Sequence, residues 1–171
     1  MRRNSRLTWD RIKVYLKDLG ITARLDVERV KEIFGLGEGL CPEPLRTIFI
    51  SNYLESNGKE QFKDLWLFSD DYVVEVLEFS RRETPRLEMT IFTGNIMYVV
   101  LEAKDFDFSK KAQGGSKLRV KFGTLGLFSC DFAAFGQNCN TLSHIFASYI
   151  KGNLVRGQQV SLPPDKLLNI T

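Results

Sequence analysis

The stretch RLEMTIFTGNIMYVVLEA, residues 86–103, reads as two β-strands folded about a Gly-Asn pair. A two-residue turn at that pair places Thr93 opposite Ile96 and fixes which residues share a face. One face of this hairpin is apolar throughout and is predicted to be a core face. It holds Leu87, Met89, Ile91, Ile96, Tyr98 and Val100.

The opposite face of the hairpin is half apolar, because charged residues stand beside four large apolar ones. Those four are Phe92, Met97, Val99 and Leu101. An antiparallel sheet usually leaves one face to water, so this second face requires a cover. The cover is either the helical segment at 8–34 or a second molecule. We predict partner binding through these four residues, with another protein or a second copy of the chain as the partner.

Strand-like alternation runs through the middle of the chain and is interrupted by turn signals such as SNG at 56–58 and TGN at 93–95. A longer polar loop, SKKAQGGS, occupies 109–116. Seven strands are therefore predicted, at 46–55, 61–68, 72–79, 86–93, 96–103, 117–122 and 125–132.

Helical periodicity appears at both ends of this strand region. Apolar stripes at 8–19 and 26–34 predict two short amphipathic helices, with Thr8 and Asp26 as caps and Gly20 as a stop. Such short helices need a docking surface. The glycine- and proline-containing segment 35–44 reads as a linker. A third helix is predicted at 140–153.

Seven antiparallel strands followed by one amphipathic helix resemble the pleckstrin-homology-like (PH-like) superfold in element order. The resemblance covers 46–153 and implies an α+β fold with a seven-stranded barrel closed by a C-terminal helix. The expected organisation is a helical appendage and linker at 1–44, the barrel with its helix at 45–154, and a partly ordered tail at 155–171. PH-like domains share no single function and bind phosphoinositides, peptides or other domains.

The resemblance also implies a place to look for phosphoinositide binding, since classical members cluster basic residues around the first hairpin loop. The corresponding stretch, YLESNGKEQFKD at 53–64, offers Lys59 and Lys63 among three acidic residues. It departs from the family pattern, so inositol phosphate binding is not expected there.

A second basic set lies further along the chain, where Lys117, Arg119 and Lys121 alternate on one strand face. Together with Arg81 and Arg82 they form a candidate anion-binding surface. Lys110, Lys111 and Arg86 lie close to this set in the sequence. The simpler interpretation is a solvated strand face with charges that protect an edge.

Catalytic and cofactor chemistry have little support in these residues. His144 is the only histidine, the three cysteines have no CxxC spacing, and the sequence holds no nucleophile elbow, Walker loop, dinucleotide fingerprint or zinc-protease motif. The carboxylate pairs Asp70–Asp71 and Asp105–Asp107 supply too few oxygen ligands for a divalent cation. We expect a protein that is not an enzyme and has no cofactor or metal.

Bulk properties narrow the remaining partners. The net charge of +3 over 171 residues, with both signs interspersed, does not argue for nucleic acid or membrane. A helix-turn-helix interpretation of 8–34 places Asp26 where a buried apolar residue is required, so nucleic-acid binding is not expected. No apolar run reaches membrane-span length and no signal peptide is visible, so a cytoplasmic location is expected.

The sequence therefore predicts a noncatalytic binding or assembly module that uses an apolar sheet face. A barrel that carries a small apolar ligand or lipid is the alternative, because 20 aromatic residues, 13 of them Phe, offer enough rings to line a cavity. Nucleic-acid binding through the helix pair at 8–34 is the less favoured alternative.

Overall fold

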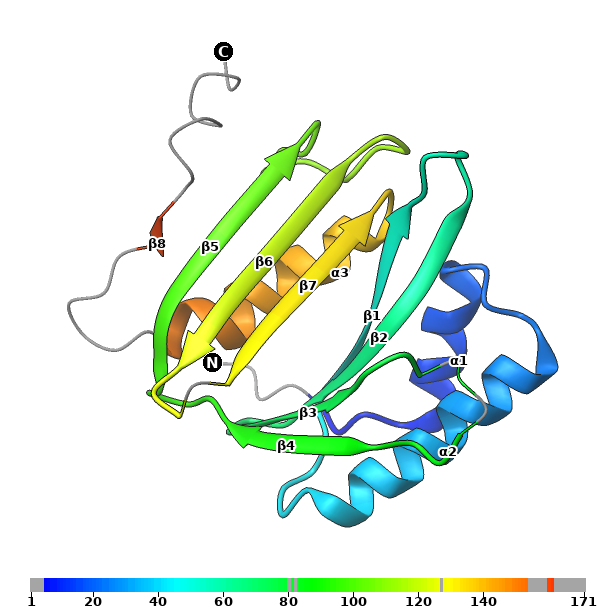
Figure 1. Cartoon of the computed structure of the whole chain (residues 1–171), viewed down its shortest axis with the longest axis vertical. Coiled ribbons are helices and arrows are strands. Elements are labelled where there is room, and N and C mark those ends of the chain that lie inside the picture. The colour runs from blue at the N-terminus through cyan, green and yellow to red at the C-terminus, as the bar shows by residue number, and fades with distance from the viewer. Residues whose placement is uncertain (1–4, 80, 82, 127, 154–159, 162–171) are drawn as a thin grey trace. The chain divides into compact units, whose positions relative to one another are not determined.

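The structure, a computed structural model, describes residues 5–79, 81, 83–126, 128–153 and 160–161. It is an α+β structure with three α-helices and two sheets (Figure 1). The helices are α1 (Trp9–Asp18), α2 (Arg24–Leu40) and α3 (Asn138–Ile145). The strands are β1 (Thr47–Leu54), β2 (Glu60–Phe68), β3 (Tyr72–Val76), β4 (Leu87–Ile91), β5 (Ile96–Lys104), β6 (Lys117–Thr124), β7 (Ser129–Phe135) and β8 (Val160–Ser161).

All seven predicted strands are present, but they form two separate sheets. The first sheet has the order β1-β2-β3-β4, and the second has the order β7-β6-β5-β8. Strand pairing stays within each sheet, so the described strands do not close into the expected barrel. The chain divides into two compact units. The first comprises residues 1–51 and 62–91, and the second comprises 52–61 and 92–171.

The predicted hairpin at 86–103 is wrong. Its two strands exist, but β4 is the last strand of the first sheet whereas β5 pairs with β6 in the second. The turn signal is real, since Gly94 has φ +66° and the Asn95 amide donates to the Phe92 carbonyl at 3.1 Å. The Asn95 carbonyl, however, accepts from Leu125 in the β6–β7 loop at 3.0 Å. The boundary between the two units falls at 91/92, inside this stretch.

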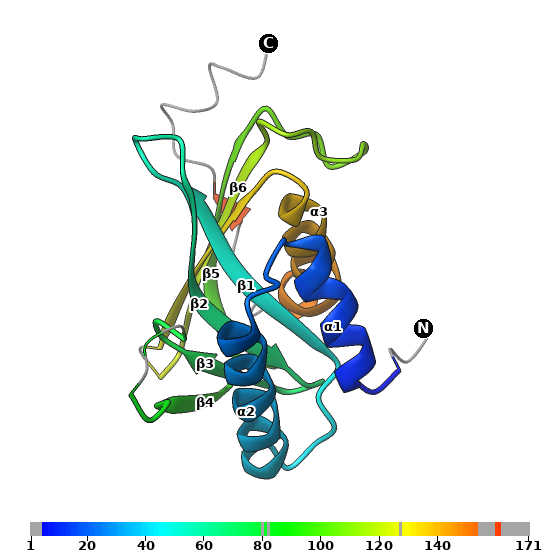
Figure 2. The same ribbon diagram turned by 90° about the vertical axis from the view of Figure 1, so that its right-hand side faces the viewer.

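In the first unit, α1 and α2 share one apolar core with a face of the first sheet (Figure 2). From the helices this core takes Ile12, Leu16, Val30, Ile33 and Phe34, and from the sheet Ile48, Ile50, Leu65, Leu67, Val74 and Val76. The alternation along each strand puts the sheet residues on one face. The helices α1 and α2 thus contribute to the core of this unit.

The second helix is longer than its sequence pattern predicts and runs through the glycines assigned to a linker. At position 37, glycine is required by the packing of the helix on the sheet. A Cβ on Gly37 would lie 2.4 Å from Leu67 Cδ1, so only glycine lets α2 approach the sheet this closely. The helix begins at Arg24 without a side-chain cap, and Asp26 lies in its first turn rather than capping it.

In the second unit, α3 packs against β6 and β7, on what we call the inner face of the second sheet. The Cys139 thiol approaches the carbonyl oxygens of Ser116 and Ala134 at 3.4 and 3.5 Å. Beyond Ile145 the helix continues as a π-helical turn, Phe146–Ile150, and a 3₁₀ turn, Lys151–Asn153. The predicted third helix is thus present, with an irregular second half.

The two faces of the stretch 86–103 are assigned differently by the structure. Phe92 and Val99 have no exposed surface, and Met97 and Leu101 are half-buried. Val99 and Leu101 pair with Phe122 and Val120 on the inner face of the second sheet. As described, Phe92 and Val99 cannot form an exposed partner-binding surface. Three residues predicted for the core are instead exposed, namely Met89, Ile91 and Tyr98.

Most of the predicted tail, 155–171, lies outside the described residues. Within it, Val160–Ser161 form β8, which runs parallel to β5 at Val99 and Val100.

Candidate ligand-binding site

The face of the second sheet opposite α3, which we call the outer face, carries the charged residues. Residues paired across adjacent antiparallel strands share a face, so the register orders these side chains into rows. From the β5–β6 loop onward the rows are Lys104–Lys117–Phe135, Glu102–Arg119–Ala133, Val100–Lys121–Asp131 and Tyr98–Gly123–Ser129.

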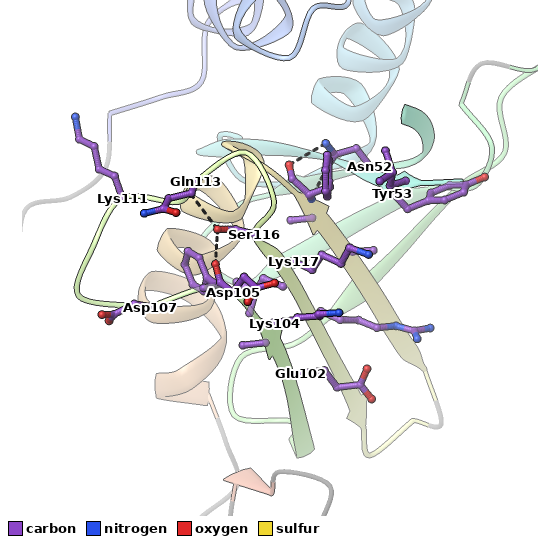
Figure 3. Close-up of a pocket in the computed structure, with 18 of the residues that line it drawn as sticks. Asn52, Tyr53, Glu102, Lys104, Asp105, Asp107, Lys111, Gln113, Ser116 and Lys117 are labelled. Atoms are coloured by element: carbon purple, nitrogen blue, oxygen red, sulfur yellow. Dashed lines mark hydrogen bonds between the residues drawn. The ribbon is translucent and has the colours of Figure 1, made fainter. Parts of the chain in front are cut away.

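The first row sets two lysines directly opposite each other. Lys104 and Lys117 are Cα partners at the loop end of β5 and β6, and both are exposed. Figure 3 shows their side chains projecting from the same side of the strands as Glu102. Neither lysine forms an ion pair with any residue that the structure describes. Like charges placed opposite each other on adjacent strands destabilise a sheet.

The next two rows compensate their own charges. Arg119 donates two hydrogen bonds to the Asp131 carboxylate, at 2.7 and 2.5 Å, and these raise the pKa of the guanidinium. Lys121 lies 4.0 Å from the same carboxylate. Glu102 is the Cα partner of Arg119 on the other side. The uncompensated positive charge of this face is therefore confined to Lys104 and Lys117.

A cavity of about 1140 Å³ opens at this first row. Its lining belongs entirely to the second unit and comes from the tip of β1, strands β5, β6 and β7, and the β5–β6 loop. The ionic residues among it are Glu102, Lys104, Asp105, Asp107, Lys110, Lys111, Lys117 and Arg119. Larger apolar or aromatic side chains add Tyr53, Leu54, Phe106, Leu118 and Phe135. A ligand of this site would thus meet both cations and apolar surface.

The loop that borders the cavity is held by short-range hydrogen bonds. Asp105 adopts φ +51°, a left-handed conformation that aspartate tolerates better than most residues. Its carbonyl accepts from the Ser116 hydroxyl at 2.6 Å, and that hydroxyl accepts from the Gln113 amide at 2.9 Å (Figure 3). Asp107 accepts from both the amide and the hydroxyl of Ser109. These bonds close the loop on itself.

The loop is also tied to the helical segment of the second unit. The Phe106 and Phe108 rings meet edge to face with their centres 5.0 Å apart. The centre of the Phe108 ring lies 6.5 Å from that of Phe146. Further on, the Ala112 amide donates to the Asn140 side chain at 2.9 Å. Because it is anchored at these two places, the loop presents a largely pre-formed wall to the cavity.

Asn52, near the tip of β1, supports the opposite wall. Its carboxamide accepts from the Phe135 amide at 2.9 Å and donates to the Phe135 carbonyl at 3.1 Å, as a neighbouring strand would. The same group accepts from Asn138 at 2.8 Å and donates to Glu60 at 2.6 Å. With all four hydrogen bonds made, Asn52 fixes the backbone that carries Phe135.

The structure brings together only part of the predicted anion-binding set. Lys117 and Arg119 line the cavity, whereas Lys121 lies one row beyond Arg119 and is not part of the lining. Arg81 belongs to the first unit and pairs with Glu78. Arg82 lies outside the described residues. Arg119 is engaged by Asp131, so it is not an open cation.

Two important residues of the site give little signal in the sequence. The predicted strand ends at 103, one position before Lys104. Pairing 96–104 with 117–124 across the loop would have placed it opposite Lys117. Asn52 gave no signal, since a polar residue near a strand end ordinarily reads as solvent-exposed.

The remaining features of chemical interest do not gather at this cavity. His144 is exposed on α3 and is absent from the cavity lining. Within the described residues, no group of three or more His, Cys, Asp or Glu side chains is arranged to hold a metal ion. None of the described helices has the length and apolarity needed to cross a membrane.

No protein-family description, curated protein or solved structure matches this chain.

Proposed function

We propose that this protein is a noncatalytic binding module that takes an amphipathic organic anion into the cavity of its second unit. The observation that carries the proposal is the directly opposed pair Lys104–Lys117, which has no ion-pair partner among the described residues and lines that cavity. A sheet gains nothing from two lysines in this position, whereas an anion between them would remove their repulsion.

The apolar part of the lining supports an organic body on the ligand. Phe135 is the Cα partner of Lys117, so an aromatic ring stands beside the cations in the same row. Tyr53 and Leu54 add exposed apolar surface at the tip of β1. Binding sites for small molecules commonly combine such apolar walls with a few placed polar groups. The volume of about 1140 Å³ is ample for a small organic molecule.

The PH-like plan stays a proposal. A four-stranded sheet, three further antiparallel strands and then a helix agree with the element order of that superfold. This order supports a binding role, because the superfold serves many kinds of recognition, but it does not select a ligand. The ligand has to be argued from the cavity itself.

The test is a titration of the isotopically labelled full-length chain with three probes that share one ring: benzoate, phenyl phosphate and phenol. At least one anion should shift the backbone amide signals of Lys104, Lys117 and Phe135, while uncharged phenol should shift them little. Lys104→Gln should weaken anion binding by about tenfold, the loss of one charge-assisted contact.

Lys121→Gln is the matched control, because it removes the same charge from the same face of the sheet, at a position outside the cavity lining. Its affinity should stay within about twofold of the unaltered chain, the change expected of a screened surface charge. The proposal fails if neither anion perturbs the cavity amides, or if Lys104→Gln and Lys121→Gln weaken binding equally.

A further inference from the structure

The charges around the cavity determine how much negative charge a ligand must bring. Along the outer face, Glu102 and Asp131 balance Arg119 and Lys121. In the loop, Asp107 pairs with Lys110 at 3.3 Å. The remaining charged residues of the loop, Asp105 and Lys111, have opposite charges and cancel in the sum. What is left is a charge of about +2, carried by the two lysines of the first row.

Geometry places both of these charges within reach of one small group. Side chains directly opposite each other on antiparallel strands have Cβ atoms about 5 Å apart. Each lysine ammonium offers three donors on a flexible stem, so both can converge on the same anion. Lys104 and Lys117 project from the same side of the sheet, whereas the Lys111 side chain points away from the strands (Figure 3).

A singly charged carboxylate would satisfy this pair only in part. It carries one charge and two oxygens, and would leave a net positive charge in the row. A phosphate monoester carries close to two negative charges at neutral pH and three terminal oxygens, which match two ammonium groups in charge and in number of contacts. Lysine is an established phosphate binder in proteins.

The rest of the row defines what the phosphate is attached to. Phe135 follows Lys117 on the next strand, and Asn52 holds the Phe135 backbone by two hydrogen bonds. Tyr53, the neighbour of Asn52 in the chain, also lines the cavity. A ligand whose phosphate lies between the lysines would thus extend an apolar or flat body over the Phe135 ring, whose backbone is held in place.

Building on the proposed function, we infer that the ligand is a soluble phosphate monoester with an apolar or aromatic body, its phosphate held between Lys104 and Lys117. Three probes test this: phenyl phosphate, benzoate with the same ring, and inorganic phosphate with no ring. All are titrated into the full-length chain at pH 7.5 and matched ionic strength, because exposed charges are screened by salt.

Phenyl phosphate should bind at least about tenfold more tightly than benzoate and more tightly than inorganic phosphate, the ratio expected for one additional charge-assisted contact. Lys104→Gln and Lys117→Gln should each remove most of the preference for phosphate over carboxylate. Lys121→Gln should retain it. A preference that survives in Lys104→Gln would overturn the assignment.

The two proposals fail in different ways. Equal binding of benzoate and phenyl phosphate at the cavity amides would overturn the phosphate assignment and leave an anion-binding module in place. Failure of both anions to perturb these amides would overturn the proposed function itself. Inorganic phosphate binding as tightly as phenyl phosphate would contradict the organic body.

A phosphate monoester can also be the headgroup of a membrane lipid. Vesicles of phosphatidylcholine with and without phosphatidate distinguish the two sources by co-sedimentation of the full chain. The soluble ligand predicts no gain in sedimentation on phosphatidate vesicles. Retention on those vesicles, without binding of soluble phenyl phosphate, would overturn it.

Discussion

Each of the two sheets sets two like charges directly opposite each other on neighbouring strands. In the first sheet the pair is Glu75 and Glu88, and in the second it is Lys104 and Lys117. The pairs differ in burial. Glu75 is 9% exposed, whereas both lysines lie on an exposed face. The same unfavourable pairing can therefore be relieved by different means.

The carboxylate pair is relieved from within the protein. Burial raises the pKa of Glu75 to about 7, and the nearby charges of Asp64 and Glu88 add to that rise. At neutral pH Glu75 thus holds a proton part of the time. The two lysines lie on an exposed face, where solvent ions or the proposed ligand can offset their repulsion.

The largest expected effect is on stability, and it compares a glycine beside each sheet whose added side chain would meet a neighbouring residue. A Cβ on Gly37 would meet the fully buried Leu67 at 2.4 Å, and a Cβ on Gly123 would meet the Tyr98 ring at 2.3 Å. Tyr98 is 46% exposed and can swing outward, whereas Leu67 cannot. Gly37→Val should lower the free energy of unfolding by about 3 kcal/mol, and Gly123→Val by about 1 kcal/mol.

Chemical denaturation of each variant measures this difference. Gly35→Ala is the control in the same helix, since nothing lies within 4 Å of its added Cβ. It should stabilise the protein by about 0.5–1 kcal/mol through helix propensity alone. Equal losses of unfolding free energy in Gly37→Val and Gly123→Val would mean that Leu67 and Tyr98 yield equally to an added side chain.

The second effect is on the pH dependence of stability, and it follows from removing Glu75 from its pair with Glu88. A pKa raised from 4.5 to about 7 means that the folded chain holds the Glu75 proton more tightly than the unfolded chain between those pH values. The free energy of unfolding should therefore fall as pH rises through this window. Glu75→Gln removes the titrating group and should be more stable than the unaltered chain above pH 7, by about 2 kcal/mol.

Below about pH 4.5 this advantage should disappear, because Glu75 is protonated in both states there. Denaturation at several pH values gives the comparison. Glu88→Gln is the companion variant, since removing its charge should lower the pKa of Glu75. Parallel stability profiles for Glu75→Gln and the unaltered chain would contradict the proton-binding interpretation.

The smallest expected effect follows from reversing the charge of one lysine of the pair. Lys104→Glu places opposite charges at the cross-strand position and should raise the free energy of unfolding by about 0.5 kcal/mol. The same change should abolish anion binding at the cavity. Thermal unfolding and the phenyl phosphate titration measure the two consequences on one sample. A gain of stability with loss of binding is the pattern expected where a site is kept at a cost to the fold.

The order of elements could be read from local signals in the sequence. The stripe at 8–19 gave α1, where Thr8 accepts from Arg11 and Gly20 follows the helix with φ +75°. Clean alternation at 117–122 gave β6 and the correct faces for Lys117, Arg119 and Lys121. These features depend on neighbours in the chain, which is why pattern and capping residues predict them.

Strand partners and burial could not be read in the same way. The Gly-Asn turn after Thr93 has the chemistry of a hairpin, yet β4 and β5 pair elsewhere. Gly37 looked like a linker residue because its reason is a contact with Leu67, 30 positions further on. The position of Lys104 opposite Lys117 likewise depends on sheet register. Contacts between distant residues decided what local patterns left open.

The carboxamide of Asn52 also occupies hydrogen-bonding groups at the edge of the second sheet. β7 is the last strand of its sheet, and the Phe135 N–H and C=O would be open to another chain if Asn52 did not bond both of them. The Asn52 side chain thus blocks the pairing of a strand from another molecule at this position. The residue that protects this position of the edge strand is a buried amide, where a surface charge would be the usual safeguard.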